Sequence, residues 1–218
     1  MDDETKRQVA HLALRRDVPL IICDVDEVVL HFVRGFERWL KERDLWLDPA
    51  SYEFEGNVRR RADNRAISDA ELSRLLEDFF HARIGALEAI EGAQAALEAL
   101  AGEAQVVMLT NLPHVFYQAR RRNLERHGMA YPLVTNSGPK GPAVRAISEK
   151  SSEPVVFIDD YPAFLESAKA HHPDAELVHF LHDPRFAPHA RQVEGARARV
   201  NCWDQARQVI VDALNRRS

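Results

Sequence analysis

Two carboxylates, those of Asp24 and Asp26, follow directly on an apolar run at residues 18–23. Side chains two positions apart in an extended segment point to the same side, so both carboxylates can converge on one small volume. Burying two acids side by side costs several kcal/mol each unless a partner neutralises their charge. We therefore expect a metal ion or a cationic side chain next to this pair.

Three further polar stretches lie where later apolar runs end, or in the loop beside such an end: Thr110 with Asn111, Lys140, and Asp159 with Asp160. Each stretch alone has an ordinary structural explanation, such as a turn, a solvated lysine or a helix cap. Their joint presence indicates a ligand-binding site, because ligands of doubly wound sheets bind beyond the carboxyl ends of the strands.

Carboxylates, a lysine and a threonine brought together form a site of hard oxygen ligands. Mg²⁺ suits such a site because it binds through one or two carboxylates, water molecules and the phosphate oxygens of a substrate. A carboxylate can also act as a nucleophile and form an aspartyl-phosphate. Phosphoryl transfer needs mainly charge neutralisation and in-line positioning, which a metal ion and a lysine ammonium group supply.

An alternation of buried strands and helices runs through most of the chain. It predicts an α/β fold with a doubly wound, Rossmann-like parallel sheet. Five strands are expected, near residues 18–24, 104–110, 131–135, 154–158 and 175–181. Helices are expected between and after them, near residues 91–101, 114–127, 142–150, 162–170 and 203–215. Residues 1–17 are expected to be a polar lead-in with a helical turn around Val9–Leu14.

Residues 31–88 interrupt this alternation. Apolar residues at helical spacing follow Leu30, and Ser68 with Glu71 has the pattern of a capping box at the start of a second helix. The stretch between the two helices, residues 44–66, is expected to be irregular. We therefore predict a small, mostly helical insert at 31–88 and an α/β core at 1–30 and 89–218. A basic cluster in the insert is better explained as a solvated face than as a substrate contact: Arg59, Arg60, Arg61 and Arg65.

Composition limits the classes of protein to which the chain can belong. A hydrophobic content of 45% with 29% charged residues is typical of a soluble globular protein, and a net charge of −5 disfavours nucleic-acid binding. Cys23 and Cys202 form neither a disulfide framework nor a zinc signature. There is no apolar run that would span a bilayer and no signal-peptide centre, so a cytoplasmic location is expected. The spacing of four histidines also matches no zinc pattern: His171, His172, His179 and His182.

The four polar stretches resemble the motifs of the haloacid dehalogenase-like (HAD) hydrolase superfamily, most of whose members are Mg²⁺-dependent phosphatases. Asp24-Val-Asp26 matches the first motif of the family, and Thr110 matches the second. Lys140 matches the third motif, and Asp159-Asp160 matches the fourth. The resemblance extends over residues 18–181, and it implies that residues 31–88 form a helical cap above the active site.

The resemblance implies a role for each residue of the first three motifs. Asp24 would be the nucleophile, and Asp26 would protonate the leaving alcohol and then activate water. The presence of Asp26 favours phosphoryl transfer over dehalogenation, because family dehalogenases generally lack an acid at that position. Thr110 would bind the phosphate group, with Asn111 beside it, and Lys140 would hold the charges of nucleophile and phosphate together.

The fourth motif implies a metal site. Asp160 would bind Mg²⁺ directly, together with the carboxylate of Asp24 and the backbone carbonyl of Asp26, and Asp159 would assist through water or through Lys140. One departure concerns Glu27, which stands where many members carry glycine. Because glutamate lacks the conformational freedom of glycine, the loop that leaves the site is expected to have a different shape.

The implied function is the hydrolysis of a small phosphorylated metabolite, with no nucleic-acid or membrane partner. Two alternatives remain open at this point. Transfer of the phosphoryl group to another acceptor, as in a mutase, shares the aspartyl-phosphate step. A catalytically silent fold of this type would instead act as a binding or regulatory module, which the complete set of catalytic groups disfavours.

Overall fold

The apolar run after residue 18 forms a short strand, β1 (Leu20–Cys23), that is buried along its whole length. The computed structural model describes residues 1–215. β1 pairs in parallel with β4 (Gln105–Thr110) on one side and with β6 (Val155–Asp159) on the other. β5 (Leu133–Thr135), β7 (Glu176–Phe180) and β8 (Ala196–Val200) complete a six-stranded sheet in the order β5-β4-β1-β6-β7-β8.

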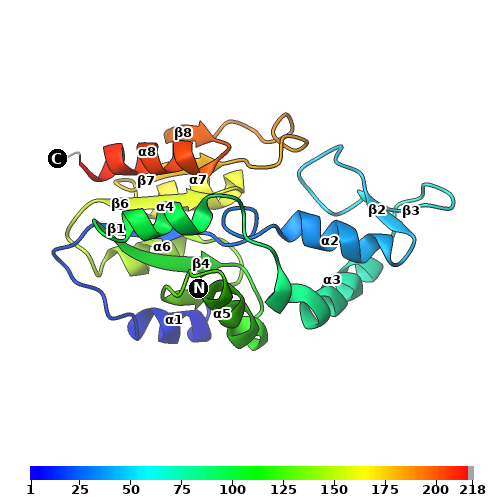
Figure 1. Ribbon diagram of the computed structural model, residues 1–218, viewed down its shortest axis with the longest axis horizontal. Helices are drawn as coiled ribbons and strands as arrows, with labels where there is room; N and C mark the ends of the chain where they lie inside the picture. Colours follow the sequence, from blue (N-terminus) through cyan, green and yellow to red (C-terminus); the bar gives the residue numbers. More distant parts are fainter. Residues whose placement is uncertain (216–218) are drawn as a thin grey trace.

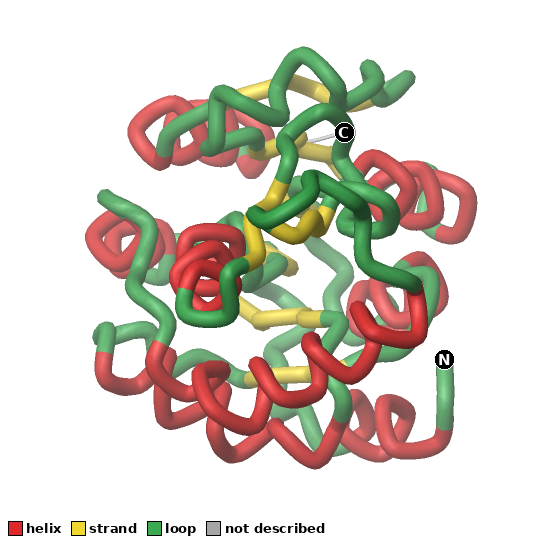
Figure 2. The backbone as a smooth tube through the Cα atoms, turned by 90° about the vertical axis from the view of Figure 1, so that its right-hand side faces the viewer, coloured by secondary structure: helices red, strands yellow, loops and turns green. Residues whose placement is uncertain are grey.

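All strand pairs of this sheet are parallel, so the carboxyl ends of the strands share one edge. Helices cover both faces, as Figure 2 shows. Alternate strand residues serve the two faces, because successive side chains of a strand point in opposite directions. Ile21 and Cys23 belong to one hydrophobic layer, and Leu20 and Ile22 belong to the other. The predicted doubly wound α/β fold is therefore confirmed.

The first of these layers packs against α4 (Ala93–Leu100) and α8 (Trp203–Leu214). The second packs against α1 (Asp3–Ala10), α6 (Gly141–Ser148) and α7 (Pro162–His171). The predicted helix at 114–127 is a 3₁₀ turn, η2 (His114–Phe116), that continues into α5 (Tyr117–Arg126). Its residue Leu124 joins the first layer, which also extends into the insert.

Residues 31–88 lie beyond the carboxyl ends of the strands, to the right of the sheet in Figure 1. They form α2 (Phe32–Lys41), α3 (Asp69–Arg83), a short 3₁₀ turn η1 (Ile84–Ala86), and a two-stranded antiparallel ribbon. The ribbon consists of β2 (Leu45–Leu47) and β3 (Val58–Arg60), so the expectation of an irregular stretch at 44–66 is wrong in this part. The division into a core and a cap at these boundaries stays a proposal.

Two further elements differ from the sequence-based expectations. The sixth strand, β8, was not expected because its sequence Ala-Arg-Ala-Arg-Val has no apolar run; it pairs only with β7, at the edge of the sheet. The lead-in forms the full helix α1 rather than a turn, and Asp2 caps it by accepting a 2.8 Å hydrogen bond from the backbone N–H of Thr5. Both elements carry many charged residues, which hides their pattern of burial.

The predicted capping box at α3 forms in part. Ser68 Oγ accepts a 3.3 Å hydrogen bond from the backbone N–H of Glu71, as expected. The Glu71 carboxylate does not bond back to Ser68 but pairs with Arg60 of β3 at 2.7 Å. The neighbouring strand therefore supplies a partner that the local pattern could not reveal. Among the helices of residues 1–215, none is both long and apolar enough to cross a membrane.

Candidate active site

Three strands deliver the predicted catalytic groups to the common edge of the sheet. Asp24 follows β1, Thr110 is the last residue of β4, and Asp159 is the last residue of β6. Lys140 lies directly before α6 and is fully buried. Its Nζ atom is 2.5 Å from Asp24 Oδ1 and 2.7 Å from Asp159 Oδ2. One buried ammonium group thus joins two of the predicted motifs.

The charges of this cluster depend on one another. Burial raises the pKa of Asp24 to about 6, although the nearby Lys140 acts in the opposite direction. Burial alone would lower the pKa of Lys140, but the carboxylates of Asp159 and Asp24 outweigh it and raise that pKa instead. Lys140 is therefore a permanent cation at neutral pH, and it favours the ionised form of the Asp24 carboxyl group.

Asp159 and Asp160 have different surroundings. Both oxygens of Asp159 are engaged, because Oδ2 contacts Lys140 and Oδ1 accepts a 2.9 Å hydrogen bond from the backbone N–H of Tyr161. Asp160 lines a cavity, and its Oδ2 accepts a 2.7 Å hydrogen bond from the hydroxyl of Tyr52 in the insert. Of these two carboxylates, that of Asp160 is the one that lines the cavity.

The surplus of negative charge at this point fits a divalent cation. Burial, followed by the neighbouring carboxylates of Asp159 and Asp24, raises the pKa of Asp160 well above its usual range. Among residues 1–215, no cationic side chain forms an ion pair with the Asp160 carboxylate. Asp24, Asp159 and Asp160 each offer an oxygen, and these oxygens lie within 4.8 Å of one another. Such a set of hard oxygen donors suits Mg²⁺.

Asp26 has a partner that the sequence did not reveal. Arg120 of α5, which is fully buried, places Nη2 2.6 Å from Asp26 Oδ1 and 2.9 Å from Oδ2. Thr110 Oγ1 lies 3.4 Å from Asp26 Oδ2. Burial raises the pKa of Asp26, while Arg120 acts to lower it. Arg120 and Leu124 of α5 follow Phe116 of η2 at intervals of four residues, and all three are buried. This helical spacing is the signal that could have identified Arg120.

Asn111 lines the cavity, but its side chain is engaged in a loop contact. Its Nδ2 donates a 2.8 Å hydrogen bond to the carbonyl of Gly138, and its Oδ1 accepts one of 2.8 Å from Asn136. Asn111 thus fastens the loop that carries Lys140 to the end of β4. Its predicted contact with phosphate stays a prediction.

The expectation of a different loop shape after β1 stays a prediction, but the Glu27 backbone itself has a conformation typical of glycine. Its φ of 60° lies in the left-handed region, so the backbone keeps the conformation that glycine favours. A non-glycine residue there costs on the order of 1–3 kcal/mol. The side chain offsets this cost, since Glu27 Oε1 accepts a 2.7 Å hydrogen bond from the backbone N–H of Val33 in the first turn of α2. Burial raises the pKa of Glu27 to about 7.

His179 of β7 contacts the loop after β6, which carries Asp160. It is buried, and its Nε2 lies 2.9 Å from the backbone carbonyl oxygen of Asp160, so that nitrogen carries the proton and donates. Burial lowers the pKa of His179 to about 4, which keeps the ring neutral. Its contribution is to hold the loop after β6, and no local sequence pattern indicated it.

A cavity of ≈ 560 Å³ lies between the insert and the end of the sheet, and Asp24, Asp26, Lys140 and Asp160 all line it. Seven aromatic residues form about half of its remaining wall: Phe32, Tyr52, Phe54, Phe80, Tyr161, Phe164 and Phe186. Arg59, Arg60 and Arg65 do not line it, because they pair within the insert with Asp48, Glu71 and Asp63. The preference for a solvated basic face over a substrate contact is consistent with this placement.

Comparison with known proteins agrees with the predicted family at the level of the fold. No protein-family model matches the sequence, and neither does any curated protein. Solved structures do match. A HAD family hydrolase of Deinococcus radiodurans with bound phosphate and sodium superposes with a TM-score of 0.59 at 19% identity, covering 91% of this chain and 97% of the other.

Two further matches are similar. A haloacid dehalogenase-like protein of unknown function from Agrobacterium tumefaciens gives a TM-score of 0.66 at 16% identity, over 89% of this chain and 98% of the other. A HAD-type protein of Bacillus subtilis bound to magnesium gives a TM-score of 0.60 at 11% identity, and the match covers 89% of this chain and 99% of the other. The chain therefore has the HAD-like fold, as the resemblance of its motifs predicted.

Proposed function

We propose that the protein is a Mg²⁺-dependent phosphomonoester hydrolase that acts through an aspartyl-phosphate on Asp24. The observation that carries the proposal is the convergence of Asp24 and Asp159 on the buried Lys140, beside an Asp160 that faces the cavity without a cationic side chain. This arrangement supplies a nucleophile, a fixed positive charge and a set of ligands for a divalent cation. A fold similar to HAD hydrolases adds support.

Each step of the reaction can be assigned to a residue. The Asp24 carboxylate attacks phosphorus, the bond to the leaving oxygen breaks, and Asp26 gives its proton to the departing alcohol. Asp26 then accepts a proton from a water molecule that attacks the phosphorus of the aspartyl-phosphate, which releases phosphate and restores Asp24. Burial raises the pKa of Asp26, which favours a carboxyl group that can hold a proton before it donates.

The other polar groups position the phosphate group of the substrate and neutralise its charge. Lys140 balances the charge of Asp24 and of the incoming phosphate group, and Thr110 with nearby backbone amides can hold the phosphate oxygens. Mg²⁺, bound by Asp160, Asp24 and the backbone carbonyl of Asp26, would supply further positive charge for the phosphate group. The Deinococcus and Bacillus structures contain phosphate and magnesium respectively, which is consistent with this assignment.

The cavity also favours one class of substrate. Seven aromatic side chains line it, together with acidic residues that include Glu53 and Glu55. Among the described residues of the lining, Lys140 is the only lysine or arginine, and the two carboxylates beside it already use its charge. A second phosphate or carboxylate on the substrate would face this acidic wall. We infer a phosphate monoester of an apolar or aromatic alcohol without a second anionic group.

Phosphate release from a panel of esters, with and without Mg²⁺, tests the proposal. Aryl and alkyl phosphates should be hydrolysed faster than sugar bisphosphates, and Asp24→Asn should abolish the release while the exposed Asp17→Asn leaves it unchanged. An absence of Mg²⁺-dependent release from every ester would favour a silent binding module. A rate that depends on an added alcohol or sugar acceptor would indicate a phosphotransferase or mutase instead.

A further inference from the structure

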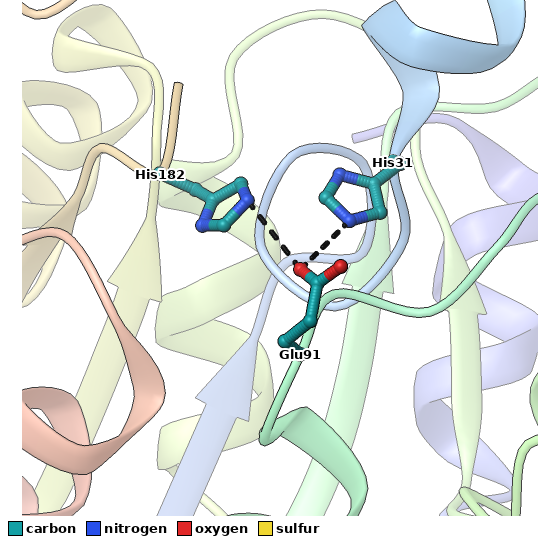
Figure 3. A group of neighbouring side chains, drawn as sticks. All are labelled: His31, Glu91 and His182. Carbon is teal, nitrogen blue, oxygen red and sulfur yellow. Dashed lines mark hydrogen bonds and ion pairs between the residues drawn. The ribbon is translucent and has the colours of Figure 1, made fainter. Parts of the chain in front are cut away.

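A second group of potential metal ligands lies outside the carboxylate cluster. His31, Glu91 and His182 point toward one another, as Figure 3 shows. His31 Nε2 lies 3.1 Å from Glu91 Oε2, and His182 Nε2 lies 3.7 Å from the same oxygen. The three residues come from different segments: the residue before α2, the segment before α4, and the loop after β7.

The distances agree with coordination of a single ion. Zinc is bound at about 2.0–2.2 Å by histidine nitrogen and carboxylate oxygen, usually in a tetrahedron, and neighbouring ligand atoms are then about 3.3–3.6 Å apart. The two separations from Glu91 Oε2 lie close to this range, and all three ligand atoms lie within 4.8 Å of one another. Small side-chain adjustments would complete the geometry.

A metal-free explanation accounts for only part of this arrangement. A hydrogen bond between His31 and Glu91 explains the shorter contact. The separation of 3.7 Å from His182 is too long for a hydrogen bond, and yet the ring of His182 lies 5.0 Å from that of His31, centroid to centroid. Without a metal, the second contact is an ion pair that requires a protonated His182 ring, whereas coordination of an ion uses both imidazoles in their neutral form.

We propose that His31, Glu91 and His182 form a binding site for Zn²⁺, with water in the fourth position. Two imidazoles and one carboxylate suit zinc, whereas Mg²⁺ prefers oxygen ligands alone. The site is thus chemically distinct from the carboxylate cluster around Asp160. The sequence offered no zinc signature, because Glu91 lies 60 positions after His31 and His182 lies another 91 positions after Glu91.

Arg34 sets a limit on the affinity. Its Nη1 lies 3.5 Å from Glu91 Oε1 and 3.5 Å from Glu88 Oε2. This contact uses the carboxylate oxygen that does not face the histidines, so it does not block the site. A nearby positive charge nevertheless disfavours a divalent cation. Replacement of Arg34 by glutamine should therefore tighten zinc binding.

The position of the site gives it a structural consequence. The two linkers of the insert pair with each other here: His31 donates its backbone N–H to the carbonyl of Glu88 at 2.9 Å, and Ile90 donates to Val29 at 2.9 Å. An ion at this point would tie both linkers to the loop after β7. His182 and its neighbour Asp183 also line the cavity, so occupancy of the site would restrain one of its walls.

Zinc binding to the full chain tests the proposal, and the measurement does not depend on phosphatase activity. The protein is first stripped with a chelator and kept in excess Mg²⁺, which occupies the carboxylate cluster. Zn²⁺ is then titrated against a chromophoric chelator, and Co²⁺ is used in parallel because its visible spectrum distinguishes tetrahedral from octahedral coordination. The variants are Glu91→Gln, His182→Gln, His31→Gln and Arg34→Gln, with the exposed His189→Gln as control.

We expect one Zn²⁺ per chain and a tetrahedral Co²⁺ spectrum. Loss of any ligand should weaken binding by at least the roughly 10–100-fold that follows loss of an outer-shell partner. Arg34→Gln should tighten binding, and His189→Gln should leave it unchanged. Glu91 and His182 have side-chain exposures of 69% and 25%, so their variants remain informative if the buried His31 variant fails to fold. Unchanged affinity in Glu91→Gln and His182→Gln, or no zinc binding in wild type, would overturn the proposal.

Discussion

The hydroxyl of Tyr52 in the insert donates a hydrogen bond of 2.7 Å to Oδ2 of Asp160, at the end of the central sheet. The same hydroxyl lies 3.1 Å from the backbone oxygen of Asp160, and the two residues are 108 positions apart in the chain. The insert therefore reaches the carboxylate that we propose as the direct Mg²⁺ ligand. This contact orients the carboxylate and couples the insert to the proposed metal site.

Tyr52→Phe removes the hydroxyl and keeps the aromatic ring. We expect Mg²⁺ affinity to fall by about 10–100-fold, because outer partners that orient a metal ligand contribute on that order. Calorimetric titration with Mg²⁺ measures the change. Tyr161→Phe is a matched control, since the Tyr161 ring stacks on Tyr52 but its hydroxyl bonds to Glu53 instead. Equal affinities in wild type and Tyr52→Phe would show that the contact does not position Asp160.

Lys140→Met leaves the buried Asp24 and Asp159 without their shared cation. Breaking a buried ion pair from one side costs about 3–5 kcal/mol, so the free energy of unfolding should fall by that order. Urea unfolding at pH 7 measures it, and hydrolysis should be lost as well. Lys140→Met combined with Asp159→Asn should recover part of the stability, because one uncompensated carboxylate is removed. If Lys140→Met alone is as stable as wild type, the buried ion pairs of Lys140 with Asp24 and Asp159 are contradicted.

Arg120→Gln removes the cation that faces Asp26. Arg120 favours the ionised form, so its loss should raise the pKa of Asp26 and shift the alkaline limb of the kcat/KM profile to higher pH. We also expect kcat to fall by about 10–100-fold, since general acid–base catalysis contributes about 10²–10⁴-fold and a displaced Asp26 loses part of it. Arg121→Gln, on the same helix but exposed, should leave the profile unchanged. A reduced kcat with an unshifted limb would indicate a packing role alone.

Glu27→Gln isolates a group whose pKa rises from 4.5 to about 7 on folding, chiefly through burial. The native state then binds this proton more tightly than the unfolded state. The contribution of the Glu27 carboxyl group to the free energy of unfolding is complete below about pH 4.5 and is lost as the pH rises through 7. In metal-free protein, Glu27→Gln should match wild type near pH 4.5 and exceed its stability at pH 8 by about 1–3 kcal/mol.

Urea unfolding of wild type and Glu27→Gln in the presence of a chelator, across pH 4.5–8, provides this comparison. The exposed Glu194→Gln serves as control, and its difference from wild type should not vary with pH in this way. If the stability difference for Glu27→Gln stays constant with pH, the carboxyl group is not protonated in the native state near neutrality.

The sequence alone was sufficient for five of the six strands of the sheet and for the carboxylate cluster. Buried strands have a continuous apolar run, and polar residues at their ends are visible in the order of the chain. Once five parallel strands are inferred, Asp24, Thr110 and Asp159 must share one edge, since the carboxyl ends of such strands lie together. The structure brings Lys140 into contact with Asp24 and Asp159, as the motifs implied.

The partners of these groups were decided by the tertiary structure. Arg120 meets Asp26 across 94 positions, and Tyr52 meets Asp160 across 108, so no local spacing could connect them. The edge strand β8 was missed because charged residues interrupt its pattern, and the two strands of the ribbon were missed because each is only three residues long. In both cases pairing with a neighbouring strand stabilises the element. Local periodicity reports which face of an element is buried, whereas the identity of a buried polar partner depends on how distant elements pack.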